Sequence, residues 1–160
     1  MKYILPFSGV ATGVVADTYK TIVAAIAADT AGYRFWVNFL ALFADDATPL
    51  EHLLAVKLAR VADVSAGSSG TGTALVPVQP DTESVASIIT AKTACSVEPT
   101  TYETTNLLVG GRHAKTGFVW QWDERDGAPV ANRDQLIGLL AAPKSTTAIT
   151  VRGVMGIVQF

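Results

Sequence analysis

The chain has 160 residues, a formal net charge of -2, 49% hydrophobic residues and only 16% charged residues. Its twelve lysines and arginines are scattered singly, so no basic patch points to a nucleic-acid or membrane partner. The single cysteine excludes an internal disulfide, and no apolar run reaches the roughly 18 residues of a transmembrane helix. The apolar start is short and broken by Pro6, so we expect no signal peptide and synthesis in a cytoplasm.

The first half of the chain predicts strands. Residues 2–9 place Tyr3, Leu5 and Phe7 on one face, and residues 18–27 are rich in β-branched side chains. Residues 33–43 give the strongest signal, with apolar residues on both faces, which is typical of a central strand. In that segment Phe35, Val37, Phe39, Ala41 and Phe43 alternate with Arg34, Trp36, Asn38, Leu40 and Leu42.

Residues 48–61 are compatible with two structures. Thr48 is a good helix N-cap, Pro49 suits the first helical position and Glu51 completes a capping box. Yet the residues from Leu54 to Val61 also alternate as they would in a strand. The local sequence favours the helix without excluding the strand.

Residues 64–83 are rich in Ser, Gly, Thr and Pro. A linker between two domains, a long loop within one domain and a phosphate-binding loop can all have this composition. A phosphate-binding loop needs a Lys followed by Ser or Thr after its glycines, and the run GSSGTGTA has no Lys. Two interpretations of this segment therefore remain, a linker between two domains and a long loop within one domain.

The second half again predicts short strands bounded by turn residues, at 84–94, 102–110, 116–124, 134–143 and 146–160. Eight or nine strands at this spacing indicate an all-β sandwich or barrel. From the alternation of apolar residues we expect a core that includes Phe35, Val37, Phe39, Ile149, Val151 and Ile157.

Few side chains could carry chemistry. His52 and His113 have no second ligand at metal spacing, and we expect Cys95 to be a buried, inert thiol rather than a nucleophile. We therefore predict no enzyme activity, no cofactor and no metal. Acidic residues gather only in predicted loops, where a trio could bind calcium but is more simply a solvated loop: Asp45 and Asp46, then Asp123, Glu124 and Asp126.

Tryptophans are the most informative large side chains. Trp120 and Trp122 share one face of a predicted strand. If exposed they would suit stacking on a sugar, as in carbohydrate-binding β-sandwich modules, whereas covered tryptophans would belong to a core or a protein interface. We favour a core or interface role, and we name Trp36, Trp120 and Trp122 as interface candidates. The sequence does not tell which of their side chains point towards the core.

Four stretches carry a resemblance that spans nearly the whole chain: MKYILPFSGVAT, LARVADVSAGSSGTGTALVPVQPDTES, GFVWQWDERD and LIGLLAAPKSTTAITVRGVMGIVQF. They are similar, in order, to an opening strand, a strand with a Ser/Gly-rich loop and a Pro-containing segment, an aromatic strand with a polar loop, and a final hairpin. In this pattern the chain resembles small virion structural proteins of tailed bacteriophages, the head decoration or minor capsid proteins. It departs from them at its end, IVQF, where an acidic tail is common.

The resemblance implies one antiparallel, jelly-roll-like β-sandwich domain over residues 1–160. In it, residues 64–83 are a loop, residues 54–61 are a strand, and at most a short helical turn lies near 48–53. It also implies a decoration protein on the virion surface, a homotrimer that binds the major capsid protein and stabilises the head shell. Low charge agrees with a subunit that hides much of its surface. The alternative is a carbohydrate- or receptor-binding β-sandwich module of a phage tail or spike.

Overall fold

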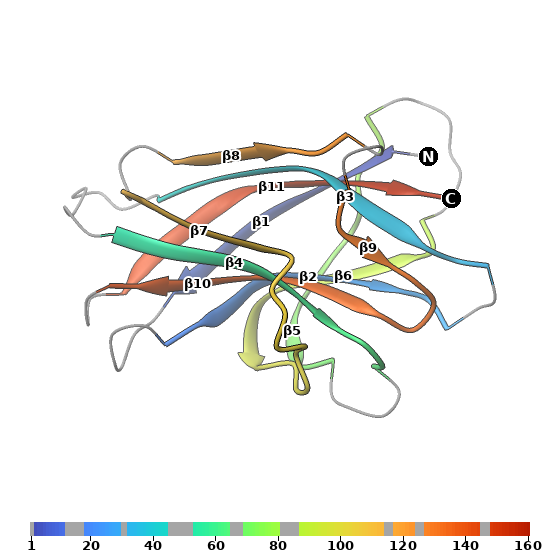
Figure 1. Cartoon of the computed structure of the whole chain (residues 1–160), viewed down its shortest axis with the longest axis horizontal. Coiled ribbons are helices and arrows are strands. Elements are labelled where there is room, and N and C mark those ends of the chain that lie inside the picture. The colour runs from blue at the N-terminus through green and yellow to red at the C-terminus, as the bar shows by residue number, and fades with distance from the viewer. Residues whose placement is uncertain are drawn as a thin grey trace.

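The computed structural model describes residues 2–11, 18–29, 32–44, 53–64, 69–80, 87–113, 117–123, 127–144 and 148–160. Within these ranges the regular elements are all strands, and they form two layers (Figure 1). The strands are β1 (Lys2–Ala11), β2 (Lys20–Ala27), β3 (Phe35–Ala44), β4 (Leu53–Val61), β5 (Thr71–Leu75), β6 (Ile89–Val97), β7 (Leu108–His113), β8 (Phe118–Gln121), β9 (Val130–Ala131), β10 (Leu136–Pro143) and β11 (Ile149–Gln159).

The strands divide into two antiparallel sheets. Sheet A has the order β1-β11-β3-β8, with β9 also paired to β3, and sheet B has the order β5-β6-β2-β10-β4-β7. Along the chain, β1, β3, β8 and β11 enter sheet A, whereas β2, β4, β7 and β10 enter sheet B. Most connections therefore cross between the layers, as in a double-sheet jelly roll. The predicted all-β, antiparallel β-sandwich is confirmed.

The core lies between the two sheets. Strand β10 is buried along its whole length, because it sits inside sheet B with β2 and β4 on either side. Its residues Ile137 and Leu139 point into the sandwich, while Leu136 packs in a small second cluster on the outer face. Five predicted core residues are fully buried: Phe35, Val37, Ile149, Val151 and Ile157.

The sixth, Phe39, was predicted wrongly. It is only half-buried and lies on the outer side of sheet A, because β3 contains a bulge. Consecutive residues of β11 pair with Phe39 and then with Val37, which leaves Asn38 as the extra residue. One extra residue shifts the alternation of faces, so Leu40 and Leu42 enter the core instead.

Strand β4 resolves the ambiguity between helix and strand at residues 54–61. The whole segment pairs with β10 on one side, and its first half pairs with β7 on the other. At most a short helical turn was expected near 48–53, and β4 begins at the last of these residues, Leu53. Residues 48–52, which include the proposed capping box, lie outside the described residues.

The Ser/Gly-rich segment at 64–83 is not one continuous loop, contrary to our prediction. Strand β5 lies within it and pairs with β6 at the edge of sheet B. Val78 then forms an isolated β-bridge with Ile4 of β1, with N–H···O distances of 2.8 and 2.9 Å. The rest of the predicted loop, at 65–68 and 81–86, lies outside the described residues.

Two polar side chains connect the sheets. The Thr93 hydroxyl on β6 lies 2.8 Å from the carbonyl oxygens of both Ser8 in β1 and Ile22 in β2. Its single proton is shared between these two acceptors. Arg60 at the end of β4 donates to the Val130 carbonyl of β9 at 3.0 Å. These contacts fix how the layers sit on one another at two places.

Candidate functional site

The outer face of sheet A carries a patch of apolar side chains. The strand register aligns Pro6 with Val154, Val154 with Ala41, and Ala41 with Val119. These four residues form one row across the sheet, and each has at least one chain neighbour in the core: Leu5 and Phe7, Met155, Leu40 and Leu42, and Phe118. Val119 is 69% exposed, and Phe43, which follows Ala41 on this face of β3, is 51% exposed. We call these five residues the outer patch.

Charge is sparse around the outer patch. Among the described outward positions of β1, β11, β3 and β8, the charged residues are Lys2 and Arg152. Arg152 lies opposite Ser8 on one side and Phe43 on the other. A partner that covers the patch therefore has few charges to desolvate, which is the main cost of closing a polar surface.

The outer face of sheet B is different, because the chain covers part of it. Leu136 and Val61 are fully buried there, and Tyr102 packs against them. The Tyr102 ring lies over Gly138, where a side chain would overlap its hydroxyl. That hydroxyl is 3.0 Å from the Thr21 hydroxyl oxygen, and burial raises the pKa of the phenol well above its usual range. The outer patch has no comparable cover among the described residues.

Trp36, the first interface candidate, is the second residue of β3 and is only 9% exposed. The Phe160 ring covers it, with the two ring centroids 3.8 Å apart. The Arg34 guanidinium lies 4.7 Å from the centroid of Phe160, so a cation–π contact completes the stack. Trp36 therefore offers a partner an edge rather than a free ring face.

Trp120 and Trp122 lie close together, but they are held differently. Trp120 is 42% exposed and stacks on Phe118, with a centroid distance of 6.1 Å. Trp122 follows the last residue of β8, packs partly against the core and lies 6.0 Å from the Trp120 ring. Its backbone N–H donates to the carbonyl of Asn38 at 3.0 Å. Of the three candidates, Trp120 is the most exposed.

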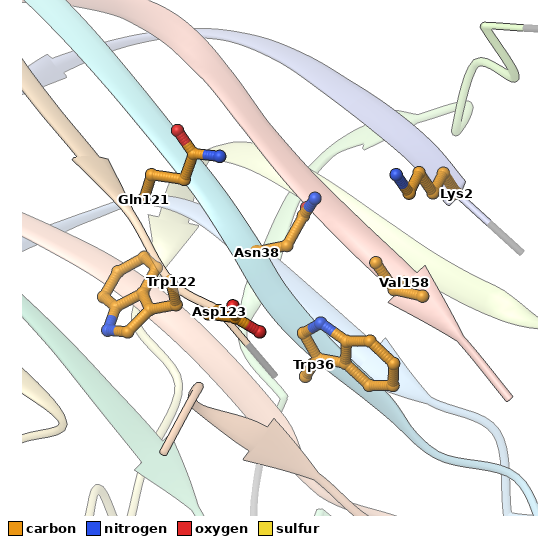
Figure 2. Close-up of a pocket in the computed structure, with 7 residues that line it drawn as sticks. All are labelled: Lys2, Trp36, Asn38, Gln121, Trp122, Asp123 and Val158. Carbon is orange, nitrogen blue, oxygen red and sulfur yellow. The ribbon is translucent and has the colours of Figure 1, made fainter. Parts of the chain in front are cut away.

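A hollow of about 570 Å³ lies beside the outer patch, and we call it the Asn38 hollow. Figure 2 shows the side chains of Asn38 and Gln121 at β3 and β8, with Val158 and Lys2 across β11 and β1. The Asn38 Oδ1 atom is buried and has no hydrogen-bond donor in the described part of the chain. It lies over Gly156, where a Cβ atom would be 2.7 Å away. The lining residues are Lys2, Trp36, Asn38, Gln121, Trp122, Asp123 and Val158.

Cys95 is half-buried rather than buried, so that expectation was too strong. Burial raises the pKa of its thiol, and the Glu98 carboxylate raises it further, against smaller opposing effects of Lys92 and Lys20. Glu98 itself accepts the backbone N–H of Thr21 at 2.9 Å and lies 3.5 Å from the Lys20 ammonium. A thiol held in its neutral form is a poor nucleophile at neutral pH.

Most of the histidines and loop carboxylates that we considered as possible ligands lie outside the described residues. His52, Asp45, Asp46, Glu124 and Asp126 lie outside the described residues, as does the side chain of His113. Within the part that is described, no three His, Cys, Asp or Glu side chains gather in a way that could hold a metal ion. The same part contains no helix long and apolar enough to cross a membrane.

No protein-family model matches the sequence, and no curated protein resembles it significantly. The candidate site therefore rests on its own geometry. Sequence reasoning named Trp36 and Trp122 but missed Asn38 and Gln121, which the structure brings beside them. The missing signal is the bulge, because an unbroken alternation along residues 33–43 does not reveal where one residue is extra.

Proposed function

We propose that the chain is a bacteriophage virion structural protein, a decoration protein that binds the head shell as a homotrimer and stabilises it. The outer patch is the observation that carries the proposal. The protein is made in the host cytoplasm and joins the major capsid protein on the capsid surface. The trimer and the phage partner rest on the resemblance of the sequence, and the outer patch supplies a surface for such contacts.

The size of the face suits a shared surface. Strands β1, β3 and β11 have 10, 10 and 11 residues and β8 has 4. At about 3.3 Å per residue and a strand spacing of about 4.8 Å, they span roughly 550 Å² in plane. A standard interface buries about 800 Å² on each partner. The face of sheet A therefore supplies more than half of one such interface, and loops at its rim have to supply the rest.

The composition of the face fits an obligate contact better than a solvated sheet. Antiparallel sheets that face water normally alternate between apolar residues inside and polar residues outside. Here Val154, Ala41 and Val119 continue the apolar character on the outside. Obligate interfaces are more apolar than transient ones, and closed symmetric homo-oligomers are the usual way to hide such a face.

Two matched variants test whether the outer patch holds the oligomer together. Val119→Asp places a carboxylate in the patch on β8, and Val109→Asp places one on β7 of sheet B. Both valines are strongly exposed, at 69% and 65%, so neither change disturbs the core. We expect the unmodified protein and Val109→Asp to sediment at three times the mass of one chain. Val119→Asp should sediment as a monomer, because burying an unpaired carboxylate is costly.

The same two proteins test the decoration role on particles assembled without this chain. Saturable binding by Val109→Asp and none by Val119→Asp is the expected result. A monomeric unmodified protein, or equal behaviour of both variants, would show that the outer patch is not the assembly surface.

A further inference from the structure

The Asn38 hollow lies on the same face as the outer patch but is built from different chemistry. It starts at Gln121, two residues along β8 from Val119, and reaches Lys2 and Val158 on β1 and β11. We propose that this hollow binds a neutral hexopyranose unit of a glycan. This inference goes beyond the proposed structural role and is independent of it.

Amide side chains make the hollow suited to hydroxyl groups. Asn38 and Gln121 each carry donors and an acceptor, so each can bind two neighbouring hydroxyls at once. Figure 2 shows the two amides on the same side of the sheet, with the Asp123 carboxylate below them. A carboxylate accepts up to about four hydrogen bonds, so Asp123 can bind a hydroxyl in addition to its contacts within the chain.

The orphaned Asn38 oxygen is a second reason to expect a ligand. A buried acceptor without a donor costs free energy, so native structures nearly always satisfy such groups. The terminal torsion of an Asn side chain is soft, and turning it brings Oδ1 from Gly156 towards the hollow. A hydroxyl of a bound sugar can then donate to it.

Two fixed indoles complete the hollow. Phe160 holds Trp36 in place, and the core holds Trp122. Trp36 presents the edge of its ring, and each indole combines apolar carbons with one N–H donor, which suits the C–H groups and the hydroxyls of a pyranose. Because the rings are already held, binding costs little side-chain entropy.

The same residues argue against other small ligands. Lys2 is the one cation among the described lining residues, and Asp123 carries the opposite charge, so a phosphate would meet repulsion as well as attraction. Among the described residues of the lining there is one carboxylate and no His or Cys, which is too few ligands for a metal site. The volume of about 570 Å³ lies within the range of ordinary ligand sites.

Fluorine NMR of protein labelled with 5-fluorotryptophan gives a direct test, because the chain has only three tryptophans. Maltotriose, cellotriose and chitotriose serve as neutral hexopyranose probes, and single Trp→Phe variants assign the signals. With at least one probe, the Trp36 and Trp122 signals should shift saturably and the Trp120 signal should shift less. Gln121→Ala should weaken binding by roughly tenfold, the size expected for one lost polar contact.

Asn132→Ala provides the matched control, because it also removes an exposed amide but lies between β9 and β10, outside the lining. It should bind the sugar as the unmodified protein does, and both variants should keep the melting temperature. No saturable shift with any probe, or equal losses in both variants, would overturn the proposal. Trp36 and Trp122 signals that respond to protein dilution but not to sugar would also overturn it, and would identify the hollow as a subunit contact. The assembly test with Val119→Asp is unaffected by any of these outcomes.

Discussion

The bulge at Asn38 decides which residues of β3 stabilise the core, and two alanine variants can test it. Leu40 is fully buried between the sheets, whereas Phe39 is half-buried on the outer side. Replacing a buried Leu by Ala costs about 2.7–5.0 kcal/mol. Full burial of a Phe side chain contributes about 1.5–3 kcal/mol, so truncating a half-buried one should cost about 1 kcal/mol.

For a chain of this length, 1 kcal/mol lowers the melting temperature by about 2–4 °C. We therefore expect Leu40→Ala to melt about 5–20 °C below the unmodified protein, and Phe39→Ala only about 2–4 °C below it. Thermal unfolding followed by circular dichroism measures both. The melts should be repeated at two protein concentrations, because dissociation of an oligomer makes the melting temperature depend on concentration.

An unbroken alternation along β3 makes the opposite prediction. Phe39 would then share the core with Phe35 and Val37, and its truncation would cost about 3–5 kcal/mol. Leu40 would then lie on the outer side of sheet A, and its replacement by Ala would cost little free energy of unfolding. A larger loss for Phe39→Ala than for Leu40→Ala, at both concentrations, would therefore refute the bulge and the position of Asn38 that follows from it.

Three further outcomes are expected. Thr93→Val should lower the free energy of unfolding in urea by about 1–3 kcal/mol, because it leaves a buried carbonyl unpaired; an unchanged urea midpoint would contradict the link between the sheets. Gly138→Ala should destabilise the protein by about 1–3 kcal/mol by displacing the Tyr102 ring, whereas Tyr102→Phe should cost only about 1 kcal/mol; the reverse order would contradict the contact. Cys95 should react with a disulfide reagent at a higher pH midpoint in the folded than in the urea-unfolded chain, because its pKa is raised. The neutral Cys95 thiol therefore contributes its full share of stability below the ordinary thiol pKa, and this share is lost as the pH rises through the raised pKa of the folded chain. Equal midpoints in the folded and unfolded chains would contradict the raised pKa.

The strands could be predicted well from the sequence, because alternation and turn residues are local signals. Residues 149–159 alternate cleanly and form β11, and the expected core members on β3 and β11 are buried apart from Phe39. The local signal failed where the chain depends on distant partners. Residues 71–75, TGTAL, give only a weak strand signal, and they form β5 because β6 offers an edge to pair with.

The candidate site was less accessible to sequence reasoning. Pro6, Val154, Ala41 and Val119 come from four separate segments, and only the strand register places them in one row. The direction of each face was also hidden, since a strand that is apolar on both sides does not reveal which side faces the core. Asn38 reaches its position only through the bulge, a feature that alternation cannot locate.

The most direct test of the proposed role is a binding titration with phage particles assembled without this chain. Purified protein is added, and bound copies per particle and the temperature of DNA release are measured. A decoration protein should bind saturably at many equivalent sites and raise the release temperature, because ligands that bind only the intact shell stabilise it by mass action. Val109→Asp should do the same, and Val119→Asp should do neither. Absence of saturable binding by the unmodified protein, or binding that leaves the release temperature unchanged, would contradict the account.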